Sequence, residues 1–336
     1  VKFIMEQTEF DLKAKNNSQE TVIHFACESG KIDLVDFLIT KKNVEVQVKD
    51  ENGKTALHSA CDSKNMDLVK YLLSYKQIDL NSREYNDKAI LHQICQEGNL
   101  NLVRNIVSLH RANLNILDDS NQTIIHYACE SENLDLVKYL IGLNEIDIAP
   151  KAEYSNTVLH SACHSGDHEM VKYIVSLNKI NINTQNPEYE TPLHIACNYG
   201  YLEIVQYLLS LKEIDVNIQD SCNETPLHLA IKSEYIDLVN LLLSHQGIDV
   251  SIIGDDKKTS LHYACDDGNL ELVKLLLAKE KLDVTAVDKD NKTLLHCACE
   301  SGNIELVKYI IDMDKIDINA KDKEKYFTLC ISIRKL

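Results

Sequence analysis

Positive charge is scarce in this sequence: its 336 residues include 35 lysines and arginines against 52 aspartates and glutamates, for a formal net charge of −17. This balance argues against a general affinity for DNA or RNA, which needs clustered cations, so we expect no nucleic acid partner. Long apolar runs are also missing. None approaches the roughly 18 residues of a membrane helix, so we expect no direct membrane span. Apolar residues still make up 44% of the chain, enough for a large core, which excludes wholesale disorder.

Signatures of enzymes are missing as well. There is no glycine-rich phosphate loop, no His-Glu-x-x-His and no Gly-x-Ser-x-Gly. Two adjacent acidic pairs occur, Asp255-Asp256 and Asp266-Asp267, but a solvated acidic face is a commoner reason for such pairs than acid–base catalysis. We therefore predict that the chain is not an enzyme, and that it has no cofactor and no small-molecule substrate.

What the chain does contain is one unit of 34 residues, repeated nine times without insertion or deletion. In every unit a histidine follows a reference position by three residues and a valine follows it by fourteen, as in Thr191, His194 and Val205. We number the units as copies one to nine by this reference position. Its residues are Thr21, Thr55, Ala89, Thr123, Thr157, Thr191, Thr225, Thr259 and Thr293.

Each copy is predicted to form two short helices. Threonine is a good N-cap because its hydroxyl accepts a hydrogen bond from the first turn, and Pro192 and Pro226 follow it where a missing N–H costs nothing. The first helix is expected to end near a position that is glycine in six copies, as at Gly200, which suits a left-handed cap. The apolar pattern of residues 202–209 predicts the second helix, and residues 214–217 form an extended piece before a turn. The predicted fold class is therefore all-α.

These copies resemble ankyrin repeats. The Thr-Pro-Leu-His-x-Ala signature of that family stands intact at residues 191–196 and 225–230 and is recognisable in the other copies. The resemblance implies a solenoid of stacked helix-turn-helix units with short β-hairpin-like connections, which binds partners on its concave surface. The third copy departs most, with Ala89, Ile94 and Asn105 in place of threonine, alanine and an aromatic residue or leucine, so we predict that it is the weakest unit.

The ends of the chain depart from the repeat. The nine copies cover residues 18–326, residues 1–17 match the tail of a further repeat, and residues 327–336 match the pattern only faintly. A solenoid needs capping repeats with a polar outer face, and neither end resembles one. We therefore expect the chain to be a fragment of a longer array.

Histidine and cysteine recur three positions apart, as at His160 and Cys163, on one helical face. A zinc site needs four ligands in one place, and Ile231 replaces the cysteine in copy seven, so we predict structural roles and no metal. The resemblance implies that the imidazole ties the threonine turn to neighbouring backbone. Stacked helices stand roughly 8–10 Å apart, too far for disulfides between neighbouring cysteines. Free thiols, with Cys222 the most exposed, indicate a reducing compartment, which favours the cytoplasm and leaves the nucleus open.

The usual contact positions of the family define candidate partner-binding residues. They lie four, three and one residues before the reference position and seven and eight after it, and over nine copies they carry 17 acidic residues and six lysines. This excess predicts a basic protein or peptide as the partner, although solubility explains an acidic face equally well. Aromatic anchors are expected to supply affinity, with Tyr154 and Tyr199 as the strongest candidates. The predicted partner-binding residues are Tyr154, His164, Tyr189, Asn198, Tyr199, Asp255, Asp256, Asp266, Asp267, Asp290 and Glu300.

The sequence is compatible with two functions. The first is a protein-interaction scaffold that binds its partner on the concave surface. The second is a regulatory or targeting array of a larger protein whose catalytic or membrane part is absent from this chain. An enzyme in its own right is the least favoured hypothesis, because no catalytic signature accompanies the repeats.

Overall fold

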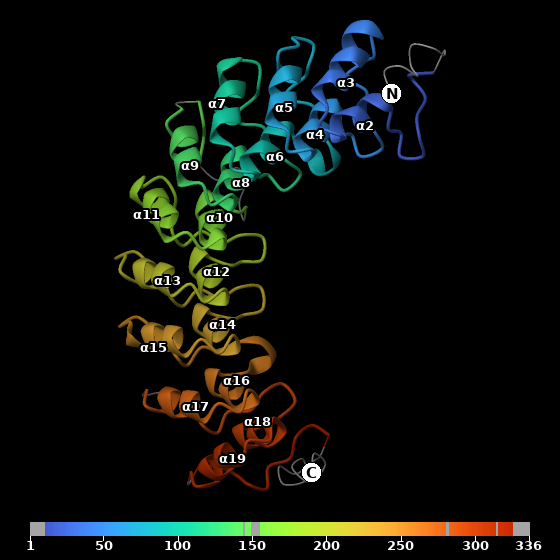
Figure 1. Cartoon of the computed structure of the whole chain (residues 1–336). Coiled ribbons are helices and arrows are strands. Elements are labelled where there is room, and N and C mark those ends of the chain that lie inside the picture. The colour runs from blue at the N-terminus through green and yellow to red at the C-terminus, as the bar shows by residue number, and fades with distance from the viewer. Residues whose placement is uncertain (1–10, 144, 149–154, 280–281, 314, 325–336) are drawn as a thin grey trace. The chain divides into compact units, whose positions relative to one another are not determined.

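The structure, a computed structural model, describes residues 11–143, 145–148, 155–279, 282–313 and 315–324 (Figure 1). The chain divides into two compact units, Val1–Ala152 and Glu153–Leu336, and each is described by itself. Most of the predicted tail at residues 1–17 and all of the degenerate end at residues 327–336, with Cys330, lie outside the described residues.

The helices come in pairs, one pair to each period of 34 residues, so the predicted all-α fold is confirmed. The first helices are α2 (Val22–Glu28), α4 (Ala56–Asp62), α6 (Ile90–Gln96), α8 (Ile124–Glu130), α10 (Val158–Ser165), α12 (Pro192–Asn198), α14 (Pro226–Lys232), α16 (Ser260–Asp266) and α18 (Leu294–Ser301). The second helices are α3 (Ile32–Asp36) with its π-helical continuation η1 (Phe37–Lys41), α5 (Met66–Leu73), α7 (Leu100–Ser108), α9 (Leu134–Ile141), α11 (His168–Ser176), α13 (Leu202–Leu209), α15 (Ile236–Ser244), α17 (Leu270–Leu277) and α19 (Ile304–Ile311).

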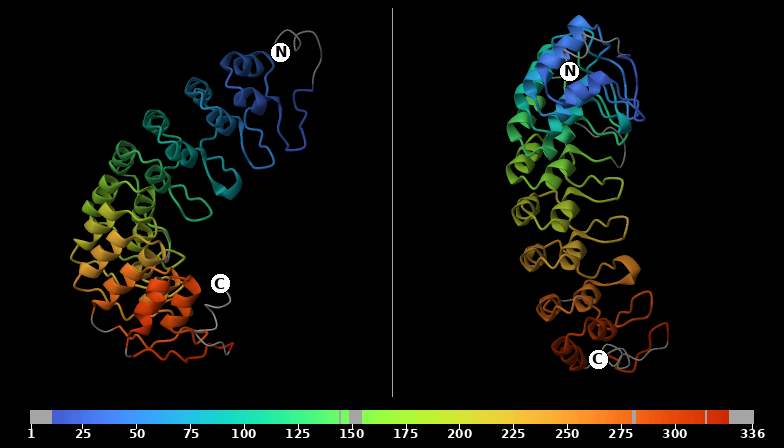
Figure 2. Two further views of the ribbon diagram at one scale, coloured as in Figure 1. Left: turned by 60° about the horizontal axis from the view of Figure 1, so that its bottom comes forward. Right: turned by 45° about the vertical axis from the view of Figure 1, so that its right-hand side comes forward.

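Within each unit, successive pairs stack side by side. In the second unit α12 packs against both α10 and α14, and α13 packs against α11 and α15. Figure 2 shows the segments that connect the pairs projecting from one side of the helices in this unit. A single pair cannot bury its apolar faces, so these neighbour contacts stabilise the stack.

In several repeats the histidine joins two copies. In copy six the backbone N–H of Thr191 donates to Nδ1 of His194 over 3.0 Å, so Nδ1 is an acceptor and the proton resides on Nε2. That Nε2–H then donates to the carbonyl oxygen of Glu224 in copy seven, 3.1 Å away. The predicted tie between the threonine turn and neighbouring backbone is thus confirmed. The same bridge joins His24 to Lys54, His160 to Glu190 and His262 to Lys292.

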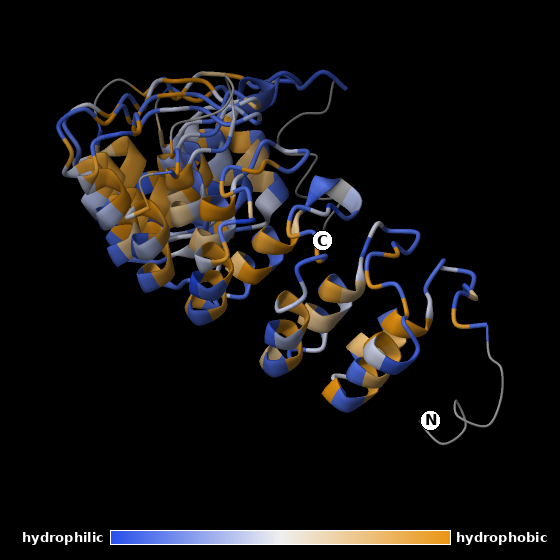
Figure 3. Cartoon of the chain, turned by 90° about the horizontal axis from the view of Figure 1, so that it is seen from above, coloured by the Kyte–Doolittle hydropathy of each residue, from blue (hydrophilic) through white to orange (hydrophobic). Residues whose placement is uncertain are grey.

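The core consists of the small and branched residues that recur on the facing sides of the helices. Leu193, Ala196, Cys197, Val205 and Leu208 are all fully buried in copy six. Figure 3 shows apolar residues gathered on the helices, with polar residues at the helix ends. The cysteines of the repeated column are buried as predicted, while Cys222 is exposed. Burial raises the pKa of these thiols, to about 12 at Cys27, which keeps them protonated and inert.

The end of every first helix requires a left-handed residue. Glycine provides it in six copies, with φ of 74° at Gly200 for example. The three replacements adopt the same conformation, with φ of 57° at Lys64, 59° at Glu132 and 58° at Glu234. A side chain in this region of backbone conformation costs roughly 1–2 kcal/mol relative to glycine. At these three residues the rest of the fold must offset that cost.

The connections are turns rather than paired strands. An isolated β-bridge joins Arg83 and Ala89, and no strand forms among the described residues. An Asp or Asn usually starts the turn, as at Asp50, whose Oδ1 accepts from the backbone N–H of Asn52 and of Lys54. Where Glu84 or Gly254 replaces it, the tip forms a short 3₁₀ helix instead. These are η2 (Tyr85–Asp87) and η3 (Asp255–Lys257).

A ladder of asparagines also joins successive copies, and the sequence did not reveal it. Asn217, in the predicted extended piece, donates from Nδ2 to the carbonyl oxygen of Gly247 over 2.8 Å and accepts at Oδ1 from the N–H of Asp249 over 2.9 Å. Both partners lie in the following copy, so one side chain fixes the register between two repeats. The equivalent residues Asn81, Asn115 and Asn183 make the same two bonds.

Candidate functional site

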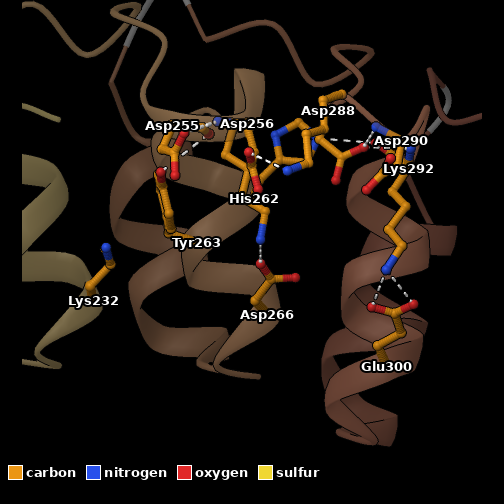
Figure 4. A network of polar contacts seen from close by, with 12 residues as sticks. Lys232, Asp255, Asp256, His262, Tyr263, Asp266, Asp288, Asp290, Lys292 and Glu300 are labelled. Carbon is orange, nitrogen blue, oxygen red and sulfur yellow. Dashed lines mark hydrogen bonds and ion pairs between the residues drawn. The ribbon is translucent and has the colours of Figure 1, made fainter. Parts of the chain in front are cut away.

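The predicted acidic residues gather on the hairpins and first helices of copies eight and nine, where lysines also lie (Figure 4). Four of the six acidic residues form ion pairs. The pairs are Asp266 with Lys258 at 2.6 Å, Glu300 with Lys292 at 2.7 Å, Asp256 with Lys289 at 2.5 Å, and Asp290 with Lys323 at 3.6 Å. Much of the charge that a count of residues assigns to a partner is therefore engaged inside the protein.

The first two pairs follow a rule of this fold. The residue before the N-cap and the residue at the end of the first helix, eight positions later, lie next to each other. Lys54 and Asp62 form the same pair in copy two at 2.8 Å. Copy seven inverts the charges, with Glu224 before the helix and Lys232 at its end, 2.9 Å apart. Because the lysines are partly exposed, each such pair contributes well under about 1 kcal/mol.

Glu224 is the most buried carboxylate of the surface, with a side chain only 3% exposed. Both of its oxygens accept from Lys232, and Oε1 also accepts from the hydroxyl of Tyr263 in copy eight over 2.9 Å. The Tyr263 ring packs on His228, with centroids 5.5 Å apart. Burial and the hydrogen bond to Glu224 raise the pKa of Tyr263 far above its usual value. This network joins copies seven and eight and is structural.

Asp255 and Asp267 differ from the other four acidic residues. Neither forms an ion pair within the described part of the chain. Oδ1 of Asp255 accepts only from the N–H of its neighbour Asp256, over 2.8 Å. Desolvation and the carboxylates of Glu234 and Asp266 raise the pKa of Asp267 to about 6. Among the six predicted acidic residues, these two are therefore the ones whose negative charge is not compensated by a lysine.

The predicted aromatic residues are only partly brought together. Tyr154 lies outside the described residues. The hydroxyl of Tyr199 lies 3.0 Å from Nε2 of His164, and the two rings meet edge to face at 5.0 Å. Asn198 is exposed at the end of α12, beside Tyr199. Tyr189 is exposed in the turn before α12, where its φ of 60° is unusual for an aromatic residue.

Two further tyrosines belong to this site and were not predicted. Tyr201 stacks on Tyr199, with centroids 5.7 Å apart and planes within 11°, and its hydroxyl points at the carbonyl oxygen of His164 over 3.4 Å. The ring of Tyr235 lies close to Gly200, the residue that separates Tyr199 from Tyr201 in the sequence. We call His164, Tyr199, Tyr201, Leu202 and Tyr235 the tyrosine patch. The sequence could have identified Tyr201 and Tyr235. The position ten residues after the reference is asparagine in five copies and tyrosine only in copies six and seven.

No group of three or more histidines, cysteines, aspartates or glutamates among the described residues is placed to hold a metal ion. None of the described helices is both long and apolar enough to cross a membrane. The features of the surface are charge, exposed rings and backbone turns, which suit recognition of another macromolecule.

Comparison with known proteins agrees with the geometry. A family model described as ankyrin repeats (3 copies) matches residues 1–84, 91–186, 159–254 and 251–322. A comparison with curated proteins found no significant match. The matched segments cover most of the chain. They contain the helix pairs, the repeated threonines and the bridging histidines described above. The chain therefore belongs to the ankyrin repeat family.

Proposed function

We propose that this chain is a protein-interaction scaffold that binds a basic protein or peptide on the hairpin tips and first helices of its second unit. Ankyrin repeats are in general protein–protein interaction modules. The observation that carries the basic character is the charge at the contact positions, with 17 acidic residues against six lysines. Asp255 and Asp267 support it further, because their charge is not used in ion pairs within the described part of the chain.

Charge of this kind acts on the rate and selectivity of association more than on affinity. A basic partner is drawn to the surface at low ionic strength, and an acidic one is repelled. The internal ion pairs reduce the number of carboxylates that a partner meets, so the effect is expected to centre on the two uncompensated aspartates. The competing explanation, solubility alone, predicts no preference for the sign of a partner.

The test compares small basic and acidic proteins of similar size as partners for the full chain, at low and at high salt. The double variant Asp255→Lys and Asp267→Lys is expected to slow association with the basic proteins and to flatten its salt dependence. The matched control, Glu213→Lys with Glu271→Lys, reverses two exposed charges elsewhere in the same unit and is expected to change little. Preferential capture of acidic proteins, or equal effects of the two double variants, would contradict the proposal.

A further inference from the structure

The tyrosine patch presents three exposed aromatic or apolar side chains close together. Tyr199 is 45% exposed, Tyr235 is 39% exposed and Leu202 is 41% exposed. Tyr199 and Leu202 belong to copy six and Tyr235 belongs to copy seven. His164 of copy five completes the patch. Clustered exposed rings of this kind are typical of interaction sites, whereas scattered apolar residues are ordinary.

The other copies show what the fold prefers at this place. In copy four the equivalent residue is Asn133, whose Oδ1 caps α9 at the N–H of Leu136 and whose Nδ2 donates to the carbonyl oxygen of Gly98 in the preceding copy. Tyr201 and Tyr235 make no such cap. Copies six and seven thus replace a side chain that makes two stabilising bonds by a tyrosine, half-buried at Tyr201 and exposed at Tyr235, so the junction gains an aromatic surface that the asparagine copies lack.

The surroundings of the patch are acidic. Residues 164–235, the span of the patch, contain ten carboxylates and four lysines, with no arginine. Glu203, next to Leu202, has a side chain 80% exposed, and Glu234, next to Tyr235, is exposed as well. Nδ1 of His168 lies 3.4 Å from Glu203, which leaves the second carboxylate oxygen toward solvent. The surface at the patch therefore offers a binding partner both aromatic rings and the carboxylates of Glu203 and Glu234.

We infer that the tyrosine patch binds arginine side chains of a peptide segment in the partner. A guanidinium group is planar and weakly hydrated, so it stacks on an aromatic face while its N–H groups bond a carboxylate. A lysine ammonium can also lie over a tyrosine ring, as Lys88 does at Tyr127, but it is a strongly hydrated point charge that neither stacks as a plane nor forms a bidentate bond with the carboxylate. The inference rests on the proposed function, since it names the side chain by which a basic partner is held.

The experiment titrates the full chain with three fluorescent peptides of equal length that alternate serine with arginine, with lysine or with glutamate. The arginine peptide is expected to bind about tenfold more tightly than the lysine peptide and to keep a larger part of its affinity at high salt. The key variant is Tyr201→Asn with Tyr235→Asn, which restores the residue found in the other copies. This variant is expected to retain its fold, checked by circular dichroism and denaturant unfolding, and to lose the preference for arginine. Tyr85→Asn, which removes an exposed tyrosine in the first unit, is the matched control and is expected to leave the affinity unchanged.

Other outcomes separate this inference from the proposed function. If the double asparagine variant binds the arginine peptide as tightly as the parent while Asp255→Lys with Asp267→Lys weakens it, the proposed function stands and the inference is wrong. Equal affinity for the arginine and lysine peptides also overturns it. Self-association of the parent that disappears in the double asparagine variant would assign the patch to a second copy of the chain instead. If no cationic peptide binds, the proposed function fails and the inference fails with it.

Discussion

Successive repeats of this protein are joined at five places by asparagine junctions and at two places by tyrosine junctions. At an asparagine junction, such as Asn303, the side chain caps its own helix and donates to the carbonyl oxygen of Gly268 in the copy before, over 2.7 Å. At a tyrosine junction, Tyr201 or Tyr235, neither bond forms and a ring covers the preceding glycine instead. The two kinds share helices, turns and histidine bridges, so the repeat tolerates either polar ties or aromatic contact at this one place.

The space beside the glycines differs between the asparagine and the tyrosine junctions. A Cβ added at Gly200 would lie 2.5 Å from the Tyr235 ring, and one added at Gly166 would lie 2.8 Å from the Tyr201 ring. At Gly30, which faces an asparagine junction, the nearest atom would be 3.5 Å away, an ordinary contact. The aromatic junction therefore depends on glycine for space as well as for its backbone conformation.

The largest expected effect is one that the two junctions share. Burial lowers the pKa of His58 and His228, at asparagine junctions, and of His194, at a tyrosine junction, to about 4. A folded pKa below the unfolded value near 6.5 means that the unfolded chain binds more protons, so stability is lost as the pH falls from about 6.5 toward 4. Between pH 7 and pH 5 each histidine is expected to cost about 2 kcal/mol.

Denaturant unfolding at the two pH values measures this loss, and histidine NMR titration assigns it. Asp267 acts in the opposite direction, because its raised pKa favours the folded state on acidification by less than about 1 kcal/mol after screening. Asp267→Asn removes that contribution and should steepen the loss. A pKa near 6.5 for His194 with a lower one for His58 would show that the junctions differ here too.

The next effect tests the space at the glycines. Gly200→Ala is expected to lower the free energy of unfolding by about 3 kcal/mol, because the left-handed backbone and the contact with the Tyr235 ring both oppose the methyl group. Gly30→Ala should cost only about 1 kcal/mol, the backbone contribution alone. Adding Tyr235→Asn to Gly200→Ala should recover part of the loss. Equal costs at the two glycines would mean that the ring moves aside freely.

A smaller effect measures the polar ties of the asparagine junction. Asn133→Ala removes the cap of α9 and the bond to Gly98, and is expected to cost about 1–2 kcal/mol in denaturant unfolding. The exposed Asn105, in the middle of α7, serves as the control. Its change to alanine should be neutral or slightly stabilising, since alanine is the better helix former. A neutral Asn133→Ala would leave the two junctions energetically indistinguishable.

The smallest effect concerns the third copy, which has an asparagine junction but no threonine cap. Ala89→Thr with Asn105→Tyr is expected to raise the free energy of unfolding by about 1 kcal/mol, because it restores the N-cap hydroxyl and a ring on the second helix. In the structure Ile94 is fully buried and His92 still bonds the carbonyl oxygen of Ile116, so the weakness is expected at the cap and not in the core. An unchanged or lower midpoint would refute the assignment of this copy as the weakest.

The sequence predicted the helices well because their signals are local. The threonine cap, Pro192 and Gly200 act on their own helix, and the burial of Cys197 follows from its place on the apolar face. Predictions about the surface were less complete. The count of charges included Lys258 and Lys292 but could not show that they pair directly with Asp266 and Glu300, since these pairs form only when the end of a hairpin lies against a helix.

The sequence by itself thus determined the repeat, its period, its helices and the residues that face the core, because these depend on neighbours within one turn or one face of a helix. Only the tertiary structure decided which contacts join one copy to the next. The asparagine ladder at Asn217, the bridge from His194 to Glu224 and the stacking of Tyr201 over Gly166 all join residues 30 to 35 positions apart. Their partners are set by the register of the stack, which arises when the apolar faces of whole repeats pack together.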